Sequence, residues 1–77
     1  MLRALVEFLA KSLVDSPDAV ELREYERDRT TILEMRVAQG DLGKVIGRQG
    51  RTAKALRTIM SNAGAHGRKR YQLDIVD

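Results

Sequence analysis

Hydrophobic and polar residues follow two different periods along this chain. Near the N-terminus, apolar residues recur at intervals of three and four positions, while charged residues lie on the opposite side of the same helical projection. Further along, and again near the C-terminus, apolar and polar residues alternate one by one, which is typical of a half-buried strand. These patterns predict a helix over residues 2–14, strands over 19–26 and 30–37, helices over 42–46 and 51–63, and a strand over 71–76.

Individual residues indicate where these elements end. Pro17 disfavours helical geometry at Ser16 and therefore ends the first helix. Asp41 is expected to cap the short helix that follows it, and Gly47 is expected to end that helix. The Gly-Ala-His-Gly segment at 64–67 is expected to terminate the next one.

The predicted order of elements is α-β-β-α-α-β, which describes an α+β domain covering residues 1–77. The charged turn at residues 27–29 joins the first two strands into an antiparallel hairpin, with Asp28 in a left-handed conformation. A strand, two helices and a returning strand imply a crossover connection, which makes the second and last strands parallel neighbours. The sequence therefore predicts a three-stranded mixed β-sheet with three helices on one face.

Charge is distributed unevenly along the chain. The 14 basic and 11 acidic residues give a net charge of +3. Residues 1–40 contain 6 basic and 8 acidic side chains, whereas residues 43–70 contain 8 basic side chains and no acidic one. Such asymmetry indicates an anionic partner that meets one part of the molecule.

Composition excludes several classes of protein. The chain has no cysteine and one histidine, so it has no disulfide framework, catalytic thiol or multi-histidine metal site. No apolar run approaches the ~18 residues that span a bilayer, and no catalytic set of side chains is recognisable. We expect a cytoplasmic, non-catalytic protein. It should bind no cofactor and no small-molecule substrate, and it should not associate with a membrane.

Two glycines enclose a short turn between the two central helices. In Gly47-Arg48-Gln49-Gly50 the glycines permit a sharp turn and leave no β-carbon facing a ligand. The following helix presents its free N–H groups and the positive end of its dipole to the same turn, which favours phosphate. Basic residues also flank the turn on both sides. We therefore expect the loop to hold a sugar-phosphate backbone.

The segment Val45-Ile46-Gly47-Arg48-Gln49-Gly50 resembles the signature of KH domains, which clamp about four nucleotides with this loop. The order of elements is similar to that of the prokaryotic, type II version of the fold. The stretches 43–47 and 50–58 further resemble the small bacterial single-KH-domain RNA-binding proteins of the KhpA family. The resemblance covers essentially the whole chain. It implies binding of single-stranded RNA, in post-transcriptional regulation or as an RNA chaperone.

The resemblance also implies which residues contact RNA. It implies that bases lie across an apolar groove. One side of this groove is formed by the first helix of the pair, the loop and the start of the second helix, and the other side by the last strand and the loop before it. It further implies a homodimer or a larger KH/R3H-domain partner. The residues expected to contact RNA are Lys44, Val45, Ile46, Gly47, Arg48, Gln49, Gly50, Arg51, Ala53, Lys54, Arg68, Lys69 and Arg70.

Other functions fit parts of the same pattern. The first helix is apolar over a wide face, and Phe8 lies off its centre, so a protein-interaction module whose main ligand is another KH-type protein is one alternative. Single-stranded DNA is a second alternative ligand. Residues 41–63 could also form a helix-turn-helix that binds duplex DNA, although the first helix is short for that role. The basic helix face and residues 68–70 are equally compatible with a solvated surface.

Overall fold

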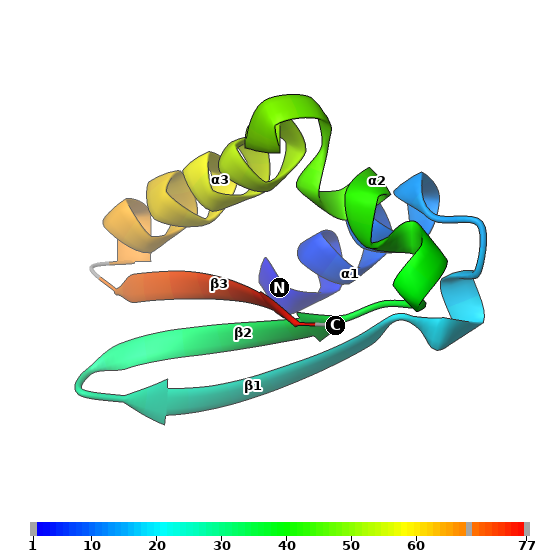
Figure 1. Ribbon diagram of the computed structural model, residues 1–77. Coiled ribbons are helices and arrows are strands. Elements are labelled where there is room, and N and C mark those ends of the chain that lie inside the picture. The colour runs from blue at the N-terminus through cyan, green and yellow to red at the C-terminus, as the bar shows by residue number, and fades with distance from the viewer. Residues whose placement is uncertain (1, 68, 77) are drawn as a thin grey trace.

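The fold consists of three helices and three strands in the predicted order. The computed structural model describes residues 2–67 and 69–76. Figure 1 shows the chain running through the helices and strands in turn. They are α1 (Leu2–Leu13), β1 (Glu21–Arg27), β2 (Thr30–Arg36), α2 (Leu42–Ile46), α3 (Arg51–Gly67) and β3 (Arg70–Val76). Within these residues, none of the helices has the length and apolar character needed to cross a bilayer.

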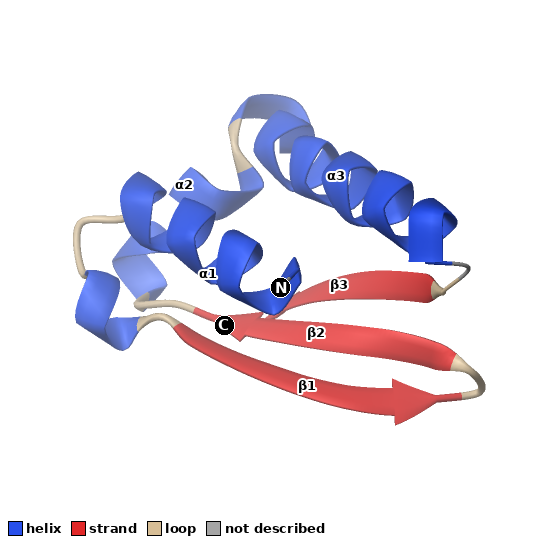
Figure 2. Cartoon of the chain, turned by 180° about the vertical axis from the view of Figure 1, so that it is seen from behind, coloured by secondary structure: helices blue, strands red, loops and turns tan. Residues whose placement is uncertain are grey.

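The sheet has the order β1-β2-β3, with β1 antiparallel and β3 parallel to the central strand. Leu33 at the middle of β2 lies opposite Glu24 of β1 and Leu73 of β3. Figures 1 and 2 show all three helices on the same face of this sheet, which leaves the other face uncovered. The predicted α+β architecture and its mixed three-stranded sheet are confirmed.

The core lies between the sheet and the helix layer. Leu33, Met35 and Leu73 of the sheet are fully buried beneath Val6, Val45 and Met60, one from each helix. Each side chain of this size stabilises the fold by about 1.5–3 kcal/mol when it is removed from water. Because α2 and α3 both anchor in this core, the turn between them is held in a fixed place above the sheet.

Helix α1 packs on the sheet through a narrower face than the sequence predicts. Val6 and Ala10 are buried, whereas Leu5 and Leu13 remain more than 40% exposed. Phe8 points away from the core and is 66% exposed. One flank of α1 therefore presents apolar side chains to solvent.

Two element boundaries differ from the prediction by more than one residue. Residues Pro17–Ala19 form a 3-10 turn, closed by an N–H bond from Val20 to the Pro17 carbonyl at 3.1 Å, so β1 begins at Glu21 rather than at residue 19. Helix α3 continues to Gly67 instead of ending at residue 63.

Gly64 explains the longer helix. It lies inside α3 and is buried, because the backbone of Lys69 returns against it: the Lys69 N–H donates to the Gly64 carbonyl at 2.7 Å. A β-carbon at position 64 would collide with the carbonyl of Lys69. This glycine therefore permits a close approach of the backbone and does not end the helix.

A two-residue turn closes the β1–β2 hairpin, and an arginine from the helix layer is hydrogen-bonded to each outer strand of the sheet. Asp28 and Arg29 form a two-residue turn with φ values of 50° and 65°, which confirms the left-handed conformation expected at Asp28. On β1, one of the two outer strands, the Leu22 carbonyl accepts a hydrogen bond from Arg3 of α1 at 2.9 Å. The other outer strand has an equivalent contact, because Arg57 of α3 donates a hydrogen bond to a backbone carbonyl of β3.

Candidate nucleic-acid interface

The loop at residues 47–50 joins α2 to α3 in a backbone conformation that requires glycine. The Gly47 N–H donates to the Gly43 carbonyl at 2.8 Å and ends α2, as predicted. Gly47 has φ 80° and ψ 169°, and Gly50 has φ 74°. Between them Gln49 also adopts a left-handed conformation, with φ 57° and ψ 26°. Three of the four residues of the loop therefore have a positive φ.

The two glycines differ in what surrounds their missing side chains. A β-carbon on Gly47 would lie 2.7 Å from the backbone nitrogen and 2.7 Å from the Cβ of Thr52. A β-carbon on Gly50 would have no atom within 4 Å. Packing within the protein thus excludes a side chain at position 47, whereas position 50 faces open space through which a ligand backbone can approach.

Positive charge gathers at the start of α3. The helix begins at Arg51, immediately after the loop, and its first turn has no acidic residue. Arg48 and Lys54 are exposed, and so is Arg51, whose guanidinium lies 3.4 Å from the Gln49 amide oxygen. The positive end of the helix dipole and three exposed cations therefore share one small surface, which attracts anions.

Lys44 is differently placed from the other predicted cations. Its ammonium group forms ion pairs with Asp15 and, at 3.5 Å, with Asp41. The hydrogen bond to Asp15 is the main reason that the pKa of Lys44 is raised above its ordinary value. Because two carboxylates already balance its charge, Lys44 contributes less positive electrostatic potential at the loop than Arg48 or Arg51.

Asp41 does not cap α2, so that prediction was wrong. Its buried carboxylate accepts hydrogen bonds from the backbone N–H groups of Asp15 at 3.1 Å and Ser16 at 3.0 Å. The hydrogen bond from Asp15 is the largest cause of the lowered pKa of Asp41. The residue thereby ties the segment after α1 to the start of α2.

The three apolar residues that are expected to contact RNA divide into two groups. Val45 is fully buried and Ala53 is 4% exposed, so both belong to the core that supports the loop. Ile46, at 37% exposed, is the one of the three that reaches the surface beside Gly47. A base lying against this site would therefore meet Ile46 first.

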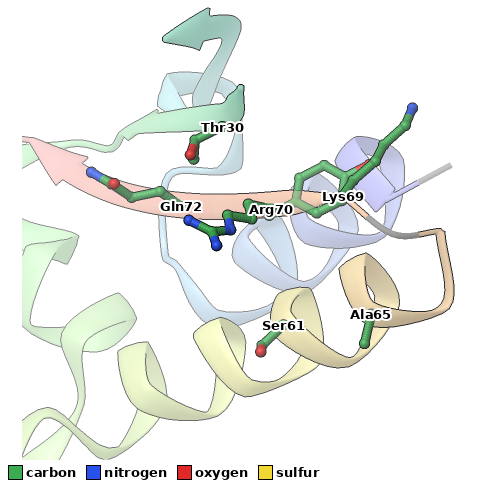
Figure 3. A pocket seen from close by; sticks show the side chains of 7 residues that line it. Thr30, Ser61, Ala65, Lys69, Arg70 and Gln72 are labelled. Atoms are coloured by element: carbon green, nitrogen blue, oxygen red, sulfur yellow. The ribbon is translucent and has the colours of Figure 1, made fainter. Parts of the chain in front are cut away.

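The second basic segment lies at the far end of α3. Lys69 and Arg70 are exposed at the start of β3, whereas Arg68 lies outside the described residues. Lys69 and Arg70 line a hollow of about 470 Å³ between α3 and β3, which we call the α3–β3 hollow (Figure 3). Its lining residues are Thr30, Ser61, Ala65, Lys69, Arg70, Tyr71 and Gln72.

Arg57 lies between the loop and the hollow, and its position was not expected from sequence. Its guanidinium donates to the Leu73 carbonyl of β3 at 3.3 Å, which connects α3 to the outer strand. Helical periodicity puts residue 57 beside the polar face of α3 but does not indicate which strand that side meets. The Leu73 carbonyl comes within reach of the Arg57 side chain only because β3 pairs in parallel with β2.

Comparison with known proteins yields a consistent set of relatives. Residues 3–75 match the family described as the KhpA/KhpB KH domain. The chain is similar to proteins named RNA-binding protein KhpA in three bacteria. In Borreliella burgdorferi the identity is 51% over 73 residues, covering 95% of this chain and 89% of the relative. In Clostridium acetobutylicum it is 47% over 75 residues, covering 97% and 100%. In Streptomyces coelicolor it is 48% over 77 residues, covering 100% and 94%.

Proposed function

The chain belongs to the KhpA/KhpB family of KH domains, and from this premise we propose that it binds single-stranded RNA without catalysing a reaction. KH domains clamp about four nucleotides with the loop that corresponds here to residues 47–50. We place its action in the cytoplasm, as a post-transcriptional regulator or RNA chaperone. The observation that most supports this function is the open space at Gly50 beside exposed cations.

In this proposal the loop holds the RNA backbone and its surroundings hold the bases. Arg48, Arg51 and the amides at the start of α3 bind two or three phosphates. Ile46 contacts a base, while Val45 and Ala53 keep the loop in place from below. For two or three neutralised phosphates on a single strand, log affinity should fall with log salt concentration with a slope of about −1.4 to −2.1. The short α2, Leu42–Ile46, disfavours the helix-turn-helix alternative.

The test replaces both inner residues of the loop, Arg48→Asp and Gln49→Asp. Asp tolerates the left-handed conformation at position 49 at least as well as Gln, so the fold should persist. The loop charge changes from +1 to −2. We expect affinity for a pool of fluorescein-labelled random octaribonucleotides, measured by anisotropy, to fall at least tenfold, with an unchanged circular dichroism spectrum.

A control variant with the same chemistry distinguishes the loop from general charge effects. Arg36→Asp with Gln39→Asp makes the same residue changes at two exposed positions, one on the end of β2 and one at the opposite end of α2 from the loop. It should retain most of the affinity for the octamers. Equal losses in a folded loop variant and a folded control, or no loss in either, would refute binding through the loop. An octadeoxynucleotide pool in the same assay separates RNA from single-stranded DNA.

The exposed flank of α1 supports a second function, association with another copy of this chain. Phe8 is 66% exposed and Leu5 44% exposed on the same side of the helix. Two such apolar side chains lose contact with water when they are covered by a partner. Sedimentation equilibrium should show a dimer that Phe8→Glu dissociates. A protein that stays monomeric at all concentrations up to about 100 μM would contradict self-association through α1.

A further inference from the structure

A cluster of three charged side chains joins the end of α1 to α2, the helix that leads into the loop. It consists of Asp15, Asp41 and Lys44, with the ammonium group of Lys44 paired to both carboxylates. Asp15 lies two residues after the end of α1, and Figures 1 and 2 show this segment beside α2. Lys44 lies three residues, about 4.5 Å along the helix axis, before Gly47 of the loop. The cluster is therefore adjacent to the place where an RNA phosphate is expected.

The two carboxylates of this cluster are held in different ways. The Asp41 side chain is 4% exposed, and its two oxygens accept hydrogen bonds from the backbone N–H groups of Asp15 and Ser16. The Asp15 side chain is 79% exposed, and within the described part of the chain its carboxylate has only Lys44 as a hydrogen-bond or ion-pair partner. When Lys44 moves away, Asp41 therefore keeps its backbone partners, whereas the Asp15 carboxylate is left to water and salt ions.

The pair between Lys44 and Asp15 can exchange with a phosphate. The Lys44 side chain is 43% exposed, and its flexible four-carbon stem lets the ammonium group turn between neighbouring anions. Ion pairs at such an exposed position are weak, because water and salt screen them. A phosphate oxygen accepts the same charge-assisted hydrogen bond from an ammonium group as a carboxylate oxygen does. A phosphate bound at the loop and the Asp15 carboxylate therefore compete for one cation.

We propose that Asp15 competes with an RNA phosphate for Lys44 and thereby lowers the affinity of the loop for RNA. This inference rests on the proposed function and assigns control of affinity to a residue outside the loop and both of its helices. In the RNA-free protein Lys44 pairs with Asp15. When RNA occupies the loop, the ammonium group of Lys44 divides its time between this carboxylate and a phosphate. Asp15 acts through Lys44 and does not contact the RNA itself.

The test is a double-mutant cycle of Asp15→Asn and Lys44→Gln, measured by anisotropy with the same octamer pool. Asn has the shape of Asp without its charge, and the hydrogen bond from residue 15 to Asp41 comes from the backbone, so the fold should persist. Asp18→Asn is the matched control. It makes the same change three residues further along, at an exposed side chain that forms no ion pair within the described residues.

Asp15→Asn should raise the affinity for octamers about two- to fivefold, because an RNA phosphate no longer has to compete with an exposed ion pair. The slope of log affinity against log salt concentration should steepen by up to about 0.7, the contribution of one further phosphate neutralised on a single strand. In the Lys44→Gln background, Asp15→Asn should do no more than Asp18→Asn does in the natural protein. A purely structural role of Asp15 would instead lower affinity and leave the salt slope unchanged.

Three results overturn the inference: Asp15→Asn leaves binding unchanged or weakens it, Asp18→Asn strengthens it as much, or the gain is the same with and without Lys44. Circular dichroism checks each variant. If Asp15→Asn does not fold, Asp15→Ser removes the same charge, keeps the backbone N–H and should show the same gain. Failure of the loop itself appears separately, as octamer binding by the natural protein that survives Arg48→Asp with Gln49→Asp.

Discussion

The two glycines of the loop provide a matched pair of substitutions. Their φ values are similar, 80° at Gly47 and 74° at Gly50, so a methyl group meets unfavourable backbone geometry at both positions. Only at Gly47 does it also meet Thr52. Comparing Gly47→Ala with Gly50→Ala therefore separates the free-energy cost of the backbone conformation from the cost of the steric clash with Thr52.

The magnitudes can be worked out from these surroundings. A left-handed conformation costs an alanine about 1–2 kcal/mol, and about 0.4–1 kcal/mol returns because alanine restricts the unfolded chain. Gly50→Ala should therefore lower the free energy of unfolding by roughly 0–1.6 kcal/mol. At Gly47 the φ and ψ values lie in a region that is essentially restricted to glycine, which costs about 1–3 kcal/mol, and the clash with Thr52 adds about 1–3 kcal/mol. With the same return of about 0.4–1 kcal/mol from the unfolded chain, the expected loss for Gly47→Ala is about 1–5.6 kcal/mol.

Urea denaturation followed by circular dichroism measures both losses. A protein of 77 residues has a free energy of unfolding of about 4–12 kcal/mol, so Gly47→Ala should move the midpoint far more than Gly50→Ala at similar slopes. Gly40→Ala is the control, because a β-carbon there meets nothing within 4 Å and the backbone is unstrained. Gly50→Ala should instead weaken binding of the octamers while staying folded. Equal losses of stability at positions 47 and 50 would refute the argument that Thr52 excludes a side chain at position 47.

Two further predictions concern stability. Gly64→Ala should destabilise the fold by about 1–3 kcal/mol in the same urea assay, although alanine favours helices, because its β-carbon collides with the Lys69 carbonyl. Gly43→Ala is the control: a β-carbon there has open space around it, so this variant should be as stable as the natural protein or more stable by up to about 1 kcal/mol. The pKa of Asp41 is lower in the folded protein than its ordinary 3.8, so its contribution to stability is present above about pH 4 and is lost as the pH falls through the lowered pKa. The melting temperature should therefore fall below about pH 4, and Asp41→Asn should reduce that dependence while lowering the melting temperature at pH 7. A Gly64→Ala variant as stable as the natural protein, or an unchanged acid profile in Asp41→Asn, would contradict these two explanations.

Local chemistry predicts much of this fold, and long-range geometry determines the rest. Alternation and helical spacing identify every strand and helix, since apolar residues such as Leu33 and Met60 must face a core. The end of α3 was misplaced because Gly64 satisfies a contact with Lys69, and that contact exists only after the chain has returned to form β3. A glycine that ends a helix and a glycine that permits close packing look the same in sequence.

The candidate site shows the same limit. The glycines and cations near the loop are adjacent in sequence, so their association could be predicted directly. The partners of Asp41 are the amides of Asp15 and Ser16, which lie 26 and 25 residues away along the chain, so sequence suggested a cap on its own helix instead. The ion pair of Lys44 could not be predicted for the same reason, since Asp15 approaches it only through the fold.

The arginines bound to the two outer strands limit how copies of this protein can assemble. Sheets commonly join edge to edge, when the unpaired backbone groups of one outer strand bond to those of another. Here Arg3 occupies a carbonyl of β1 and Arg57 occupies a carbonyl of β3, and each would have to withdraw before a new strand could pair. A concentrated solution should therefore resist fibril growth through either edge. Replacing both arginines with alanine should shorten the lag before thioflavin fluorescence rises under mildly destabilising conditions, so the helix layer that presents the loop also protects the sheet beneath it.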